Sequence, residues 1–315
     1  MIPVLLEILQ LLLLATLAPL LTGLVRKLKA RLTGRRGPRL AQPYRDLLRL
    51  LRKEVVLAPN ASWLFRTSPY LIFAAIWLAA AIVPTFATGL LLGRTADLIA
   101  LVALLGTARF ALALAGMDVG TSFGGIGSSR EMMIASLAEP AMLMVTFTVA
   151  LLVRSTSLPH IAEFMLTQDV GVRVSLLLGL ISLMIVAIGE NARIPVDNPA
   201  THLELTMVHE AMILEYSGRH LALIEAAAML KLLLYVSLIA AIFVPWGLAV
   251  GTPGAGGLAI GLASYAAKLA IGGGLLAIFE TGMAKMRVFR VAEFLGAALL
   301  LGVLAVLFLY VSEGL

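Results

Sequence analysis

Residues 2–25 read IPVLLEILQLLLLATLAPLLTGLV, an apolar run near the start of the chain. An α-helix needs about 20 apolar residues to cross the hydrocarbon layer, so this run is long enough to span a membrane. It has no basic segment before it and no A-x-A-like cleavage site, which indicates a retained span and not a signal peptide. Over all 315 residues, 61% are hydrophobic and only 13% are charged. This composition lies outside the range of soluble proteins and indicates an integral membrane protein.

Seven similar runs follow the first. The predicted spans are residues 3–25, 70–92, 97–117, 134–153, 173–189, 222–246, 258–280 and 291–311. The fifth is the weakest, because its length is at the lower limit for crossing a bilayer. We therefore expect an all-α, polytopic protein of about eight transmembrane helices, with residues 1–315 forming a single membrane domain.

Positive charge is distributed unequally between the two sets of loops. If the N-terminus lies outside, the inner connections carry 18 lysines and arginines, and the outer connections carry only Arg94, Arg154 and Arg173. The positive-inside rule then places both termini outside and the long polar loops in the cytoplasm. These basic loops beside the spans explain the isoelectric point near 9.8. We therefore expect a multi-pass protein of the cytoplasmic (inner) membrane, in contact with lipid and not with nucleic acid.

The chain has no cysteine. This excludes disulfide bonds, thiolate metal sites and cysteine-ligated iron–sulfur clusters within it. We expect no cofactor in this chain, so any redox centre must belong to a partner.

The first inner loop, residues 26–69, is strongly basic. Apolar residues recur at helical spacing from Pro43 to Glu54, which predicts an amphipathic helix at the membrane face. Two interpretations of its charge stay open. In the first, the cations serve topology alone and meet anionic headgroups. In the second, they form a docking surface or an entrance to the membrane. The candidate docking residues of this loop are Arg35, Arg36, Gln42 and Asp46.

A second polar segment covers residues 190–218. Pro195 and Pro199 prevent a continuous helix, and Asp197 or Asn198 before Pro199 predicts the start of a short cytoplasmic helix. The candidate docking residues are Arg193, Asp197, His202 and His209, and the candidate proton-handling residues are Glu190, Glu204, Glu210 and Glu215.

Three interpretations of this second segment remain open. A metal site formed by His202, Glu204, His209 and Glu210 lacks the H-E-x-x-H spacing. A solvated helix with exposed acids is the second interpretation. The third is a proton-handling or docking site, in which partly buried carboxylates near Arg193 have altered pKa values and exchange protons.

Ionisable residues also lie within the predicted spans. A charge at the bilayer centre costs at least ~2.5–3.5 kcal/mol, so such groups normally face a protein interior or a water path. The set comprises Arg109, Glu139, Glu225, Lys231, Lys268 and Glu280. For the cations of this set, a structural ion pair is the alternative to a proton relay.

The fourth span follows a loop that places Arg130 and Glu131 at the inner surface. Glu139 is expected about two turns deeper, beside Pro140, where the helix is loosened and water reaches it. A row of acids then leads from the cytoplasmic helix past Glu190 towards Glu139 and Glu225. We expect this row to carry protons, so that neutralising Glu139 and Glu204 uncouples or disables the protein without removing it from the membrane.

Three segments together resemble one known family. They read GENARIPVDNPATHLELTMVHEAMILEYSG, GRRGPRLAQPYRDLLRLLRKE and FGGIGSSREMMIASLAEP. They are similar to the membrane subunit of formate hydrogenlyase and hydrogenase-4 complexes, the group 4 nickel–iron hydrogenases, which is related to respiratory complex I subunit 1. The resemblance extends over most of the chain, with the segments in the same order.

This resemblance implies a non-catalytic subunit that anchors a cytoplasmic redox arm and links its chemistry to proton movement. The implied partners are the hydrogenase small and large subunits, an iron–sulfur subunit and an antiporter-like membrane subunit. The iron–sulfur clusters and the nickel–iron centre would belong to those partners. By matching motif, Glu190, Arg193 and Asp197 take the E-x-x-R-x-P-x-D positions, Glu204 and Glu215 those of loop acids, and Glu139 that of a span acid.

Two other functions stay open from the sequence. In complex I subunit 1 the corresponding loops form a quinone cavity, but the longer stretch THLELTMVHEAM here favours the hydrogenase branch. An independent ion transporter is the other alternative, although the chain has no visible inverted repeat.

Overall fold

The structure, a computed structural model, describes residues 2–168, 173–197, 207–251, 254–284 and 286–313. Every regular element within these ranges is a helix, which confirms the predicted all-α membrane fold. The elements are α1 (Ile2–Leu32), α2 (Gln42–Leu51), α3 (Trp63–Ile82), the 3₁₀ turn η1 (Leu92–Thr95), α4 (Leu98–Asp118), α5 (Ser122–Val153), α6 (Leu158–Thr167), α7 (Val174–Glu190), α8 (His209–Ile213), α9 (Gly218–Phe243), α10 (Ala255–Gly282) and α11 (Val288–Glu313).

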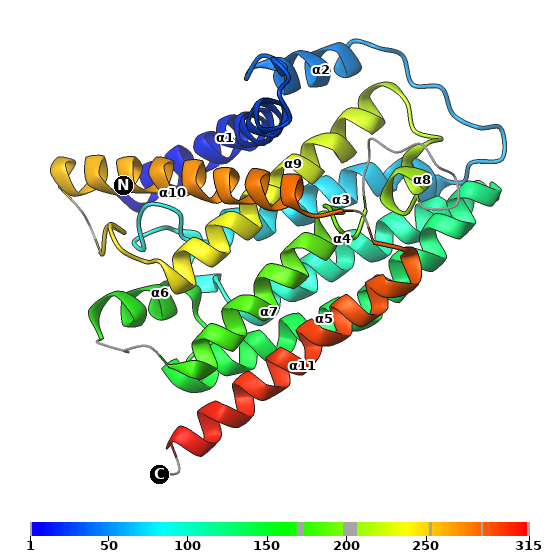
Figure 1. Ribbon diagram of the computed structural model, residues 1–315. Coiled ribbons are helices and arrows are strands. Elements are labelled where there is room, and N and C mark those ends of the chain that lie inside the picture. Colours follow the sequence, from blue (N-terminus) through cyan, green and yellow to red (C-terminus); the bar gives the residue numbers. More distant parts are fainter. Residues whose placement is uncertain (1, 169–172, 198–206, 252–253, 285, 314–315) are drawn as a thin grey trace.

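The long helices lie side by side and form an elongated bundle (Figure 1). α11 runs along α5 and α7, α3 packs on α4 and α9, and α1 packs on α10. Small residues allow this close packing, because lipid provides no hydrophobic force between helices and backbones must approach one another. Ser182 of α7, for example, donates a hydrogen bond of 2.7 Å to the Ala298 carbonyl of α11.

Seven described helices are long and apolar enough to cross a membrane, namely α1, α3, α4, α5, α9, α10 and α11. The chain is therefore a multi-pass membrane protein. α7, the predicted weak fifth span, has 17 residues and a length of about 25 Å, a little less than the hydrocarbon thickness of ~30 Å. It packs against both α5 and α11, which compensates for its shortness with protein contacts.

α3 and α5 begin 7 and 12 residues before their predicted spans at 70 and 134, and α3 ends at Ile82, 10 residues before the predicted end at 92. α3 starts at Trp63 because the Ser62 hydroxyl accepts a hydrogen bond of 3.1 Å from the Leu64 N–H. α5 starts at Ser122, capped in the same way by Thr121. The sequence predicted that Arg130 and Glu131 lie in a loop. This prediction is wrong, because both residues lie in α5. Hydropathy marks only the part of a helix that crosses lipid, while polar residues continue the helix beyond it.

The cytoplasmic helix predicted to follow Asn198 is only partly described. Within the described residues it is the five-residue α8. Asp197 contacts the start of α8 from outside that helix, because its Oδ2 accepts hydrogen bonds of 3.3 Å from the N–H groups of Val208 and His209. The helix start predicted at Pro199 lies outside the described residues. His202 and Glu204 lie outside the described residues, and so does their part in the candidate metal site with His209 and Glu210.

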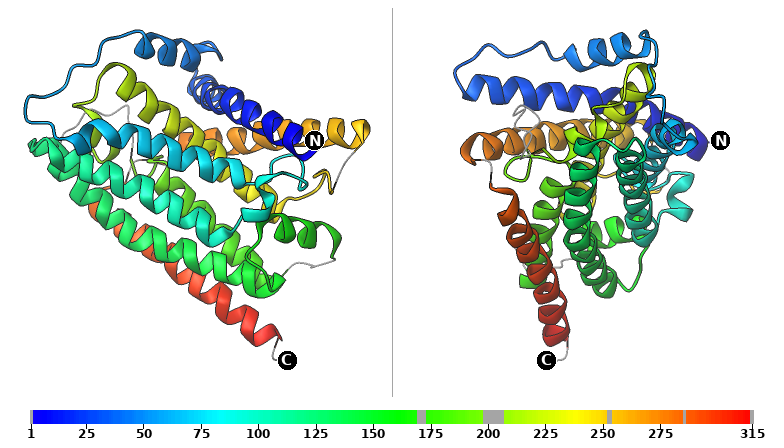
Figure 2. Two further views of the ribbon diagram at one scale, coloured as in Figure 1. Left: turned by 180° about the vertical axis from the view of Figure 1, so that it is seen from behind. Right: turned by 90° about the vertical axis from the view of Figure 1, so that its right-hand side faces the viewer.

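The two ends of the bundle differ. α1 begins and α11 ends at the same end of the bundle, and α8 lies towards the opposite end (Figures 1 and 2). Trp63, at the α8 end, is 75% exposed, and Trp246, just after α9 at the other end, is 68% exposed. Tryptophan favours the membrane–water interface, so these two side chains are placed as an interfacial belt requires.

The loop after α2 is fastened to the start of α9. Val56 N–H donates to the Ser217 hydroxyl at 2.8 Å, and that hydroxyl donates to the Val56 carbonyl at 3.0 Å. Gly218 has a positive φ of 53°, and a Cβ built there would lie 2.5 Å from the Glu54 carbonyl oxygen. This contact leaves no room for a side chain.

We expect Gly218→Ala to lower the stability of the protein by more than the ~1–2 kcal/mol that a left-handed conformation alone costs, because the new Cβ also collides with backbone. Gly120→Ala is the matched control, since Gly120 has a φ of 72° with nothing within 4 Å of its Cβ position. The thermal midpoints of both variants in detergent measure the difference. Equal losses would show that the contact with Glu54 is unimportant.

Candidate functional site

Five charged side chains meet inside the bundle, and we call them the Arg109 cluster: Arg109, Glu131, Glu139, Glu190 and Lys231. The Arg109 guanidinium reaches Glu131 Oε1 at 3.3 Å and Glu139 Oε1 at 3.4 Å, and it also pairs with Glu190. Lys231 Nζ lies 2.8 Å from the second Glu190 oxygen. The Arg109 side chain is 2% exposed and the Glu190 side chain 5%. Apart from Glu139, the cluster is therefore a largely buried ion network within the membrane-spanning part of the protein.

Four helices bring the Arg109 cluster together. Arg109 lies on α4, Lys231 lies on α9, and Glu190 is the last residue of α7. Glu131 and Glu139 are eight residues apart on α5, a little over two turns, so both turn towards Arg109. Gly106, one turn before Arg109, leaves room for the Glu139 carboxylate, whose Oε1 lies 3.5 Å from the position that a Cβ would take there.

The charges of the Arg109 cluster do not balance. Three carboxylates face two cations, which leaves one negative charge in excess when all five groups are ionised. An uncompensated charge is costly in a buried site. The cluster thus contains one more carboxylate than its two cations can pair.

A small cavity adjoins the Arg109 cluster. Its volume is about 70 Å³, and its lining includes Arg109, Glu131, Glu190 and Lys231. A water molecule takes about 30 Å³ of liquid volume, so this cavity has space for about two. It provides the polar partners that water in a buried site requires.

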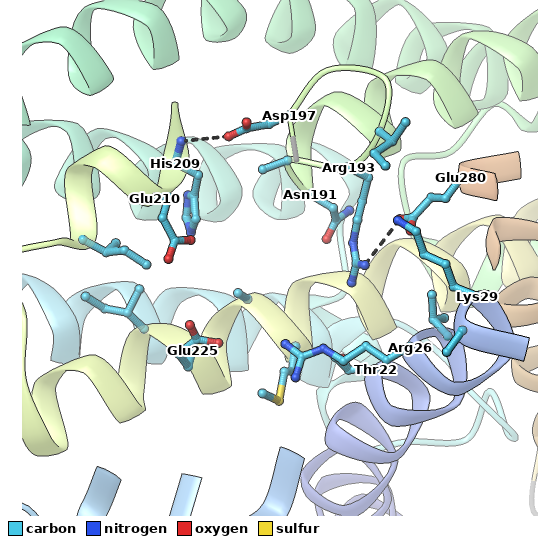
Figure 3. Close-up of a pocket in the computed structure, with 18 of the residues that line it drawn as sticks. Thr22, Arg26, Lys29, Asn191, Arg193, Asp197, His209, Glu210, Glu225 and Glu280 are labelled. Carbon is cyan, nitrogen blue, oxygen red and sulfur yellow. Dashed lines mark hydrogen bonds and ion pairs between the residues drawn. The ribbon is translucent and has the colours of Figure 1, made fainter. Parts of the chain in front are cut away.

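A larger cavity of about 540 Å³ lies between α1, α9 and the loop after α7 (Figure 3). It shares the lining residues Asn191, Ala192, His209, Ile224 and Ala228 with the small cavity, so the two cavities are adjacent. Glu210 and Glu225 project into one half of it, and Arg26, Lys29 and Arg193 into the other half (Figure 3). Polar lining residues therefore extend from the large cavity to the neighbourhood of the Arg109 cluster.

Glu280 organises the basic half of the large cavity. Its carboxylate accepts hydrogen bonds from Lys29 Nζ at 3.0 Å and from Arg193 Nη1 at 3.3 Å. This joins α1, α10 and the loop after α7 at one point. Burial lowers the pKa of the Arg193 guanidinium, and the Glu280 carboxylate acts in the opposite direction. The carboxylate thus favours the charged form of Arg193.

The predicted site residues have different outcomes. Glu131, Glu139, Glu190 and Lys231 meet in the Arg109 cluster, and Glu210, Glu225, Glu280, Arg35, Arg193, Asp197 and His209 line the large cavity. The remaining described residues lie elsewhere. Arg130 donates to the Met207 carbonyl at 2.7 Å, Gln42 donates to Asp46 within α2 at 3.0 Å, and Arg36 is exposed. Glu215 and Lys268 line neither cavity, and Lys268 forms no ion pair within the described ranges.

The sequence interpretation missed several residues of this site. Arg109 was noted as a charge within a span, but its role as the shared partner of three carboxylates depends on helices far apart in sequence. Lys29 and Arg26 were included in the basic first loop but were not named as site residues. Nothing in the sequence pattern marked Asn191 as a site residue, except that it follows Glu190. Among the residues that the structure describes, no three histidine or acidic side chains are grouped to hold a metal ion.

Comparisons with known proteins give consistent results. The family model described as NADH dehydrogenase matches residues 6–311. The chain is 34% identical over 284 residues to formate hydrogenlyase subunit 4 of Escherichia coli (strain K12), covering 90% of this chain and 91% of that protein. It is 33% identical over 238 residues to hydrogenase-4 component C of the same organism, covering 76% and 74%.

The fold is also similar to a solved structure. A chain of the membrane-bound sulfane sulfur reductase, an archaeal respiratory membrane complex, superposes with a TM-score of 0.80 at 20% sequence identity. The match covers 96% of this chain and 98% of the other. This likeness concerns the arrangement of the helices.

Proposed function

Because the chain belongs to the NADH dehydrogenase family, we propose that it is the membrane-anchoring and proton-coupling subunit of a group 4 [NiFe]-hydrogenase complex. In this proposal its α8 end binds the cytoplasmic iron–sulfur and hydrogenase subunits, and its interior moves protons. The membrane is the cytoplasmic membrane. Iron–sulfur clusters and the nickel–iron centre belong to the partner subunits, since this chain has no cysteine to hold them.

The relatives support a role within a larger assembly. Formate hydrogenlyase subunit 4 and hydrogenase-4 component C are named as parts of complexes, and the chain covers most of the length of both. The protein therefore belongs among subunits of multi-subunit membrane complexes. Its own side chains can hold and transfer protons, whereas electron transfer requires groups that a partner supplies.

The observation that carries the proton proposal is that the large cavity adjoins the small cavity beside the Arg109 cluster. Protons enter at the α8 end, where Glu210 and Glu225 line the large cavity. His209 and Asn191 lie where the two cavities meet. Beyond them the Glu190 carboxylate sits between Arg109 and Lys231 and accepts the proton.

Glu139 is the exit of this path. Its side chain is 42% exposed although it lies within a membrane-spanning helix. A carboxylate facing lipid costs several kcal/mol, so such groups normally face a protein or water. We therefore place a second membrane subunit, of the antiporter-like type, over Glu139 to receive the proton.

A purification tests the assignment of the complex. We expect the chain, extracted from its native membrane in mild detergent, to elute together with iron–sulfur proteins and with nickel in stoichiometric amount. Mass spectrometry of the peak and metal analysis measure this. A sample treated with a chaotrope, which separates peripheral subunits, provides the control because iron and nickel should then leave the chain. Elution of the chain alone would favour an independent transporter and contradict the proposal.

A further inference from the structure

The cations and the carboxylates of the large cavity gather in separate halves, and entry of protons does not require this separation. Its lining contains four cations, Arg26, Lys29, Arg35 and Arg193, and four carboxylates, so the formal charge sums to zero. Two of the cations, Arg26 and Lys29, lie on α1, and Glu210 and Glu225 face the cavity from the opposite half (Figure 3). The site is therefore neutral as a whole but strongly polarised.

The basic half has more positive charge than its carboxylate can neutralise. Lys29 and Arg193 share the single carboxylate of Glu280. Arg26 and Arg35 form no ion pair with any residue in the described ranges. The Arg26 charge also lowers the pKa of Arg193, which indicates that the two cations face the same space. A bound anion would relieve this repulsion.

The cavity lies where the apolar run of α1 gives way to basic residues, which is the pattern expected at the boundary between lipid tails and headgroups. Val25 ends the apolar run of α1, and Arg26 starts its basic extension. Glu280 lies two residues before the end of α10, at the same end of the bundle. Val25, Ile224 and Met229 add apolar lining beside the charges. An occupant that combines an anionic group with an apolar chain suits this position.

We propose that this cavity binds the headgroup of a zwitterionic phospholipid with a primary amine, that is, a phosphatidylethanolamine. The phosphate lies against Arg26 and Arg35, and the ammonium lies towards Glu225. Basic pockets between helices on the cytoplasmic side are suited to lipid phosphates. The acidic half and the zero net charge favour a zwitterion over an anionic lipid. A quinone ring is neutral and gains little from four cations.

This inference does not depend on the proposed proton path, because lipid binding is measured directly. The complex is purified in mild detergent, washed free of lipid and incubated separately with phosphatidylethanolamine, phosphatidylglycerol and inorganic phosphate. Native mass spectrometry counts the molecules that remain on the chain. We expect one phosphatidylethanolamine per chain, about tenfold weaker retention of phosphatidylglycerol, and no retained inorganic phosphate.

Charge variants locate the site. The double variant Arg26→Gln/Arg35→Gln should weaken retention of phosphatidylethanolamine about tenfold, since charge-assisted hydrogen bonds to the phosphate are lost. Glu225→Gln should remove the preference for phosphatidylethanolamine over phosphatidylglycerol. Arg36→Gln and Glu215→Gln are matched controls, because both residues lie outside the cavity lining, and both should retain the lipid as the unaltered chain does.

Three results would overturn the inference. The first is equal lipid retention by the cavity variants and their controls. The second is retention of inorganic phosphate without lipid, which would make the basic half a simple anion site. The third is displacement of the lipid by ubiquinone without any effect of the charge variants, which would assign the cavity to a neutral ring.

Discussion

Arg109→Gln is expected to destabilise the protein by about 3–5 kcal/mol, the usual cost of removing one partner from a buried ion pair. Arg109 contacts three carboxylates and is itself almost fully buried. Without it, Glu131, Glu139 and Glu190 either remain charged against one cation or take up protons. Thermal unfolding of the purified chain in detergent measures the loss as a lower midpoint, by about 5 °C or more for a chain of this size.

Lys268→Gln is the matched control for Arg109→Gln. Lys268 also lies in a spanning helix, but it forms no ion pair within the described ranges, and its loss should cost under about 1 kcal/mol. The double variant Arg109→Gln/Glu190→Gln removes one charge of each sign and should recover part of the stability. If Arg109→Gln unfolds at the same temperature as Lys268→Gln, the Arg109 cluster does not stabilise the fold.

Glu190→Gln is expected to reduce coupled proton transfer by about a hundredfold, at the lower end of what a positioned proton carrier contributes. Glutamine keeps the size of Glu190 and one acceptor oxygen of the two that face Arg109 and Lys231, but it cannot bind a transferable proton. The measurement is the pH change in vesicles that contain the reconstituted complex, together with the rate of hydrogen formation. Proton transfer should fall while the complex stays assembled and membrane-bound.

Glu139→Gln separates a proton role from a structural one. The Glu139 side chain is 42% exposed and makes one contact with Arg109 at 3.4 Å, so its neutralisation should change the thermal midpoint little. Proton transfer should nevertheless fall as strongly as in Glu190→Gln. Glu215→Gln, outside both cavities, should leave transfer intact. Unchanged proton transfer in both Glu139→Gln and Glu190→Gln would refute the proposed path.

The general architecture could be predicted from local pattern. Apolar runs of sufficient length predicted the helices, and the three motifs predicted the relationship to hydrogenase membrane subunits, which the comparisons confirm. The amphipathic segment after Pro43 forms α2, as expected. These predictions succeed because each depends on residues that are close together in the sequence. The starts of α3 and α5 were misplaced because a helix can extend beyond the lipid.

The sequence by itself is enough to conclude that the chain crosses a membrane several times. It also shows that the polar residues are concentrated in a few segments. Only the tertiary structure decided which of those groups meet. The motif at residues 190–197 shows why. Glu190 joins the Arg109 cluster, Arg193 binds Glu280 of α10, and Asp197 caps the start of α8. These three residues are close in sequence but have partners in three different parts of the fold. The reason is that each partner is set by which helices, distant in sequence, pack against the motif.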